Sequence, residues 1–120
     1  MTAAITWYAE LAVKPGQLAD FEQLTGEMVA AGHTEAGVLA YQRFSSDDNQ
    51  IIVVYERYAD SESAVAHLRK FAAEFGDRYS RLVERTCFMV LGVPSPELRG
   101  LLDAYGARYF GPFGAFAYLG

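Results

Sequence analysis

Four consecutive β-branched residues, Ile51-Ile52-Val53-Val54, constrain the fold of this chain more than any other run. β-Branched side chains favour an extended backbone, so residues 50–58 are predicted to form a strand. A strand with one wet face alternates apolar and polar residues, and this run does not alternate. Both of its faces must therefore be covered, either by other parts of the same chain or by another chain.

Three further strands are predicted around this run. The polar segment 45–49 is rich in turn-forming residues, which predicts a hairpin between residues 50–58 and a strand over residues 37–44. Residues 3–13 carry apolar side chains at their odd positions, the period of a strand with one drier face. A last strand is predicted over residues 86–93, again with apolar residues on both faces.

Two long segments have the helical period instead, with apolar residues three or four positions apart. The first covers residues 17–31. The second begins at Asp60 or Ser61, either of which can cap a helix N-terminus. Its apolar stripe extends to Val83, and Gly76 is the position where it can break into two helices.

The order β-α-β-β-α-β is the split βαβ pattern of a ferredoxin-like α+β domain, predicted here over residues 1–93. Both helices of such a domain lie on one face of the sheet. The other face would bear the apolar side chains of the third and fourth strands, so a second copy is expected to cover it. The prediction is a homodimer packed sheet to sheet, a dimeric α+β barrel.

Residues 94–120 form an extension to this domain. Pro94-Ser95-Pro96-Glu97 predicts an extra C-terminal helix, with Ser95 as the cap and Pro96 at the first helical position. The tail 109–116 is glycine-rich and contains four aromatic residues. At roughly 25 cal/mol per Å² of buried apolar surface, docking these rings stabilises by several kcal/mol. The extension is therefore expected to pack on the same domain or on the partner subunit.

Charge and composition exclude several classes of function. The net charge is −5 with no basic block, which argues against a nucleic-acid partner. Arg78, Arg81 and Arg85 alternate with acidic residues and are predicted to lie on a solvated helix face. The single cysteine, Cys87, excludes an internal disulfide or a cysteine-built zinc site and is predicted to be a buried small hydrophobe. Neither a signal peptide nor a membrane-spanning run is recognisable, so a cytoplasmic protein with no membrane association is expected.

His67 and Glu56 are the candidates for proton chemistry. His67 borders the buried stripe of the second helix, so it is either a boundary histidine bonded to solvent or backbone, or a ring that faces a pocket between helix and sheet. Glu56 interrupts an apolar strand and needs a partner, because burying a lone charge is costly. Arg43 on the paired strand can supply it, as can Arg57 of a second subunit. A structural charge pair at the sheet or dimer seam is favoured over catalysis.

Aromatic residues on the strands suggest a binding pocket, although packing in the core is the alternative for each. Trp7 is the only tryptophan and falls on the drier face of its strand. Together with Tyr41 it can form the wall of a flat apolar pocket suited to a planar ring. The two histidines, His33 and His67, lie far apart in the sequence, so no metal site is predicted.

The sequence resembles the antibiotic-biosynthesis monooxygenase superfamily, in particular its quinol-monooxygenase-like branch. The resemblance rests on Glu35-Ala36-Gly37 followed by Tyr41, then on the strand end Tyr55-Glu56-Arg57-Tyr58, and then on Ala66-His67 in the helix. It covers roughly residues 3–93 and leaves the C-terminal extension outside. It implies a cofactor-independent monooxygenase, in which a phenol- or quinol-type molecule is deprotonated and its anion reacts with O2 without flavin or metal.

The same resemblance implies roles for individual residues. His67 matches the family's helix histidine and is the expected base or proton shuttle, and Tyr41 is the expected hydrogen-bond donor. Trp7, Tyr58 and Phe71 are expected to contact the substrate. The haem-degrading branch is a poor match, because its iron-binding histidine corresponds to Asp77 here. Fold does not fix function, so a non-catalytic dimeric module that binds a small molecule or has a regulatory role is the alternative.

Overall fold

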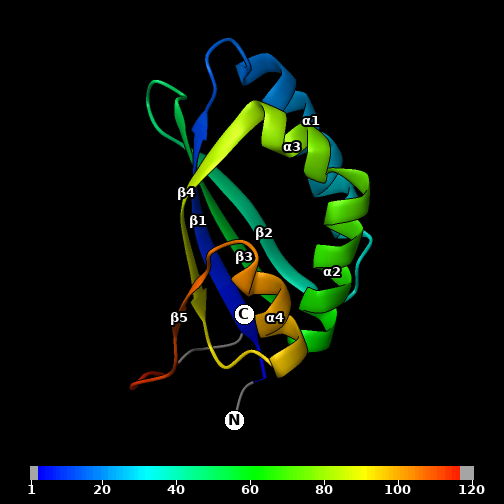
Figure 1. Ribbon diagram of the computed structural model, residues 1–120, viewed down its shortest axis with the longest axis vertical. Helices are drawn as coiled ribbons and strands as arrows, with labels where there is room; N and C mark the ends of the chain where they lie inside the picture. Colours follow the sequence, from blue (N-terminus) through cyan, green and yellow to red (C-terminus); the bar gives the residue numbers. More distant parts are fainter. Residues whose placement is uncertain (1–2, 117–120) are drawn as a thin grey trace.

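The computed structural model of the protein describes residues 3–116 (Figure 1). The elements in chain order are β1 (Ile5–Val13), α1 (Leu18–His33), β2 (Val38–Ser45), β3 (Ile51–Tyr58), α2 (Ser61–Glu74), α3 (Gly76–Leu82), β4 (Val83–Leu91), α4 (Pro96–Asp103) and β5 (Arg108–Phe110). This order confirms the predicted βαββαβ core and the extra C-terminal helix. None of the helices within residues 3–116 has the length and apolar character that crossing a membrane requires.

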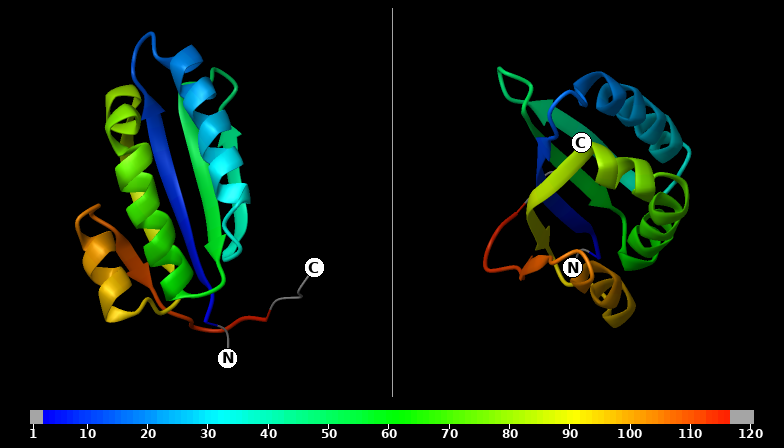
Figure 2. Two further views of the ribbon diagram at one scale, coloured as in Figure 1. Left: turned by 90° about the vertical axis from the view of Figure 1, so that its right-hand side faces the viewer. Right: turned by 45° about the horizontal axis from the view of Figure 1, so that its top comes forward.

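Within the described residues the strands form a single sheet in the order β2-β3-β1-β4-β5. The first four strands are antiparallel neighbours, and β5 runs parallel to β4. The order β2-β3-β1-β4 confirms the ferredoxin-like α+β fold. The helices gather on one face of the sheet, and between residues 3 and 116 no helix covers the other face (Figures 1 and 2).

The core lies between the sheet and the helices, where the predicted periodicities place it. The odd positions of β1 are all buried, and β3 buries alternate residues beginning with Ile52. The helices contribute apolar side chains at helical spacing. The buried hydrophobic residues of β1, α1 and α2 are Ile5, Trp7, Ala9, Leu11, Val13, Phe21, Leu24, Met28, Ala64, Val65 and Leu68.

The second helical segment is divided as predicted, but its end differs from the prediction. Phe75 leaves the helical conformation between α2 and α3, and α3 begins at Gly76. The predicted start of the last strand at residue 86 is wrong, because Val83 is already extended (φ −139°, ψ 160°). Val83 is 3% exposed, so this β-branched residue joins the core from a strand rather than from a helix.

The C-terminal extension adds both a helix and a strand to the domain. Ser95 caps α4 as predicted, since its hydroxyl accepts the Leu98 N–H at 3.2 Å, and Leu98 and Leu102 are fully buried. The short strand β5 is not predicted by the sequence. Beyond it, Phe113 is fully exposed, so the side chain of this residue does not pack on its own domain.

We predict that Gly37→Ala lowers the free energy of unfolding by about 1–3 kcal/mol through overpacking. A Cβ at Gly37 would overlap the Ser63 side chain in the first turn of α2. Chemical denaturation measures the loss, and adding Ser63→Gly should recover part of it. The control is Gly26→Ala on α1, where a Cβ meets no atom within 4 Å. That variant should be more stable by about 0.4–1 kcal/mol, and an equal loss in both variants would contradict the steric explanation.

Candidate functional site

The buried carboxylate of Glu56 lies in the middle of the helix-facing side of the sheet. It is 5% exposed. Strand register places Tyr41 of β2 on one side of Glu56 and Trp7 of β1 on the other. The neighbouring row on the same face contains Arg43 of β2 and the small side chain of Ala9 of β1. Alternation along three adjacent strands therefore brings acidic, basic and aromatic groups together.

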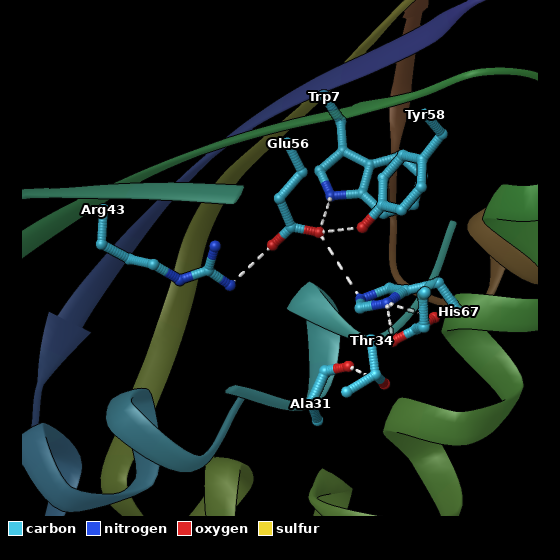
Figure 3. Close-up of polar contacts among 8 residues, drawn as sticks. Trp7, Ala31, Thr34, Arg43, Glu56, Tyr58 and His67 are labelled. Carbon is cyan, nitrogen blue, oxygen red and sulfur yellow. Dashed lines mark hydrogen bonds and ion pairs between the residues drawn. The ribbon is translucent and has the colours of Figure 1, made fainter. Parts of the chain in front are cut away.

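Three side chains donate hydrogen bonds to Glu56 (Figure 3). Trp7 Nε1 donates to Oε1 at 3.0 Å, and the Tyr58 hydroxyl donates to the same oxygen. Arg43 Nη2 donates to Oε2 at 2.7 Å. Charge-assisted donors of this kind stabilise a carboxylate in a buried site. The predicted pairing of Glu56 with Arg43 is confirmed, and it lies on the helix side of the sheet, away from the face expected to meet a second subunit.

His67 projects from α2 onto the same carboxylate (Figure 3). Its Nε2 lies 3.7 Å from Glu56 Oε1, and its Nδ1 lies 3.2 Å from Glu35 Oε1. The residue is 6% exposed, and its ring packs against those of Tyr41 and Tyr58. When the Nδ1–H donates a hydrogen bond to Glu35, the lone pair of Nε2 lies on the side of Glu56. An imidazolium formed at Nε2 then lies between two carboxylates.

A partly open cavity with a volume of about 40 Å³ lies against this cluster, between the sheet and the helices. The hollow measures about 430 Å³ when the solvent-filled space at its mouth is included. The cavity itself holds no more than a few water-sized groups. Its polar lining consists of Arg43, Glu56, His67 and Arg85, and its aromatic walls are Trp7, Tyr41, Phe71, Tyr79, Phe88 and Tyr105.

The phenols around the cavity keep their protons. Burial raises the pKa of Tyr41, Tyr58 and Tyr79 above its ordinary value, and the charge of Glu56 raises these pKa values further. At neutral pH these groups therefore donate hydrogen bonds and do not act as bases. Burial opposes the charged form of Arg43, but the adjacent Glu56 carboxylate holds the pKa of the guanidinium above its usual range.

Four of the five residues predicted for catalysis or substrate binding line the cavity, namely Trp7, Tyr41, His67 and Phe71. Tyr58, predicted to contact the substrate, lies behind Trp7. It is fully buried, and the centroids of the two rings are 4.5 Å apart. Because its hydroxyl is used on Glu56, Tyr58 holds the carboxylate and the indole in place rather than facing the cavity.

The prediction that Arg85 lies on a solvated helix face is wrong, because the residue belongs to β4. A shift in the β1–β4 register turns both Arg85 and Phe88 toward the helices. The Arg85 guanidinium carbon lies 5.4 Å from the ring centroid of Tyr79 and 5.1 Å from those of Phe88 and Tyr105. The β-branched residues Val83 and Thr86 on either side of Arg85 are the sequence signal for a strand at this position.

Glu35, the partner of His67, was part of the sequence motif but had no predicted role. No cluster of three or more potential metal-ligating side chains occurs anywhere in residues 3–116.

A protein-family model described as antibiotic biosynthesis monooxygenase matches residues 4–74, which is more than half of the chain. The chain belongs to this family. The order of Glu35, Glu56 and His67 along the matched segment is the one on which the resemblance in the sequence rests. Among curated proteins, no sequence matches the chain.

Several solved structures share the fold. MupZ from Pseudomonas fluorescens has a TM-score of 0.87 at 18% identity, and the likeness covers 98% of this chain and 96% of MupZ. A putative antibiotic biosynthesis monooxygenase from Nitrosomonas europaea has a TM-score of 0.67 at 19% identity, covering 80% of this chain and 95% of that one. A conserved protein from Methanosarcina mazei Go1 has a TM-score of 0.67 at 22% identity, with coverages of 74% and 91%. The likeness to MupZ therefore includes the C-terminal extension.

We predict that Glu56→Ala lowers the free energy of unfolding by about 3–5 kcal/mol, because it leaves the buried guanidinium of Arg43 without its anion. Urea denaturation followed by far-UV circular dichroism measures the change. Glu97→Ala is the matched control, since its ion pair with Arg69 at 3.0 Å has side chains that are 64% and 63% exposed. Removing that pair should change stability little. Similar losses in the two variants would show that Glu56 does not organise the core.

Proposed function

We propose that the protein is a cofactor-independent monooxygenase that oxidises a phenol- or quinol-type aromatic molecule with O2. Membership of the family supports this class of chemistry. The geometric support is the position of His67, whose Nδ1 is held by Glu35 while its ring lines an aromatic cavity. A histidine oriented in this way is suited to remove a phenolic proton at the cavity wall.

In the proposed reaction the substrate's phenolic or enolic proton passes to His67 Nε2. The resulting imidazolium is stabilised by the carboxylates of Glu35 and Glu56. Tyr41, which keeps its own proton, can donate a hydrogen bond to the substrate oxygen as that oxygen gains negative charge. The electron-rich anion then reduces O2. In an anthrone-type substrate the ring CH2 becomes a carbonyl that holds one oxygen atom, and the other oxygen leaves as water with the two hydrogens removed.

The size of the cavity sets a condition on this proposal. Ligand pockets usually measure about 300–1,000 Å³, and the cavity here measures about 40 Å³. A ring substrate therefore has to displace side chains at the mouth. Phe71 and Tyr105 are partly buried and line the hollow, so they are the groups that would move. Trp7, held by Glu56 and Tyr58, would remain as the fixed wall.

The same observation favours a second candidate function. A cavity lined by aromatic side chains can bind a small apolar ligand without catalysing a reaction of that ligand. The alternative is therefore a non-catalytic dimeric module of the same fold that binds or senses such a molecule. Oxygen consumption separates the two candidates.

We predict steady oxygen uptake with a panel of quinols and anthrone-like phenols, and we predict that His67→Ala lowers turnover at least about tenfold with the fold intact. An oxygen electrode measures the rates. His33→Ala is the control, because His33 is an exposed histidine at the end of α1 and should leave turnover unchanged. Unchanged turnover in His67→Ala would remove this residue from the mechanism. A panel that raises the melting temperature without oxygen uptake would favour the binding module.

The protein is further proposed to form a homodimer through the face of the sheet that the described helices leave uncovered. Three large apolar side chains on this face are 38–55% exposed, namely Phe44, Ile51 and Leu91. Val53 lies between Phe44 and Glu10 in the register of the same face. Exposed apolar surface of this kind is typical of an interface, and a second copy would close the two sheets into an α+β barrel.

The tail is proposed to extend this interface. Residues 111–116 leave β5 on the side of the sheet that faces away from the helices (Figures 1 and 2). Phe113 is fully exposed there. A partner packed on the same side would lie within reach of this aromatic side chain. The extension 94–120 would then serve both copies, with α4 on its own domain and the tail on the other.

Sedimentation equilibrium at micromolar concentration tests the dimer. We predict a dimer for the wild type and a folded monomer for Val53→Asp, because the new carboxylate would lie beside Glu10 in an apolar contact. Val29→Asp is the control, since Val29 is 41% exposed on α1, away from the proposed interface. A monomeric wild type, or a dimer that survives Val53→Asp, would contradict packing through this face.

A further inference from the structure

Two guanidinium groups reach the cavity on the helix-facing side of the sheet, Arg43 from β2 and Arg85 from β4, with β3 and β1 between these two strands. Each has a buried nitrogen, Arg43 Nη1 and Arg85 Nε, that donates to no acceptor within the described part of the chain. Buried donors in folded proteins almost always have a hydrogen-bond partner. Two unpartnered donors at one cavity therefore indicate a ligand that carries acceptor atoms.

Arg85 is the more unusual of the two. Arg43 is paired with Glu56, whereas Arg85 forms no ion pair with any residue between 3 and 116. Its polar neighbour is the uncharged Tyr79 hydroxyl, and the rest of its surroundings are aromatic rings. Cation–π contacts offset part of the cost of removing the guanidinium from water, but they do not neutralise its charge.

The charged groups that line the cavity do not balance. Arg43 and Arg85 contribute two positive charges and Glu56 one negative charge, so the lining has a formal charge of +1 when His67 is neutral. An uncompensated charge that is largely removed from water is disfavoured. An anion bound next to Arg85 would remove the imbalance.

The shape of the site limits what this anion can be. Ala9 and Val54 lie side by side in the row between Arg43 and Phe88, and their small side chains form the floor of the cavity. The walls are flat aromatic rings, among them Trp7 and Tyr105. Once Phe71 and Tyr105 move aside, a planar aromatic ring can lie between such walls, with its acidic edge turned toward the guanidinium groups.

We propose that the cavity binds a planar aromatic carboxylate and that Arg85, assisted by Arg43 Nη1, recognises the carboxylate oxygens. A guanidinium presents parallel N–H donors that match a carboxylate, which makes Arg85 the specificity-determining residue of the site. This inference rests on the proposed function in taking the cavity as the substrate site, and it narrows the substrate class to phenols or quinols that also carry an acid group. Binding itself does not require turnover.

Isothermal titration calorimetry of the full chain with 2-naphthoate and with its neutral isostere 2-naphthamide tests the proposal. The wild type should bind the acid at least tenfold more tightly than the amide. Arg85→Gln should remove this preference by weakening acid binding at least tenfold, with amide binding nearly unchanged. Arg85→Lys, which keeps the charge but not the paired donors, should retain part of the preference. Arg69→Gln removes an exposed guanidinium and is the matched control, so it should leave both affinities unchanged.

Equal affinities of the wild type for acid and amide would overturn the proposal, as would an acid preference that survives in a folded Arg85→Gln variant. If Arg85→Gln does not fold, the wild-type ratio and Arg85→Lys decide the question. Oxygen uptake with hydroxylated naphthoates separates this inference from the proposed function. Tight binding of acids without uptake would leave the carboxylate site standing and remove the monooxygenase. Oxygen uptake with neutral quinols, without a preference for acids in binding, would support the monooxygenase and rule out the carboxylate site.

Discussion

A carboxylate buried beneath a layer of helices stays ionised only when hydrogen-bond donors surround it. The candidate site of this protein depends on such donors around Glu56. Its three donors come from three different strands, Trp7 from β1, Arg43 from β2 and Tyr58 from β3. Each donor is fixed by the bond it makes, so the register of the sheet sets the positions of the indole wall and of one guanidinium. The hydrogen bonds that stabilise Glu56 therefore also fix the aromatic wall of the pocket.

His67 connects this cluster to the chemistry proposed for the family. Its two ring nitrogens face Glu35 and Glu56, so the ring can gain a proton without leaving an unpaired charge in the core. Arg85 lies at the opposite extreme, because no carboxylate of the described chain compensates it. The protein itself compensates the charge of a protonated His67. We propose that a ligand compensates the charge of Arg85.

The sequence predicts the elements whose signals are local. The alternation in β1, the hairpin before β3 and the Ser95 cap of α4 all depend on residues close together in the chain. The failures depend on tertiary structure. Arg85 reads as part of a charged helix face, and it turns inward because β4 begins early and its register with β1 shifts. The three-residue strand β5 is too short for a detectable period, and it exists because β4 offers it a free edge.

The state of Glu56 is accessible to infrared difference spectroscopy, with Glu56→Gln used to assign its bands. If the three donors hold a carboxylate, the wild-type protein at neutral pH shows carboxylate stretching bands that are absent from the variant. It then shows no carbonyl stretch of a protonated carboxyl group at this residue. A carbonyl stretch that disappears in Glu56→Gln would mean that the carboxyl group is neutral, and the charge arrangement described for Arg43, His67 and the cavity would be wrong.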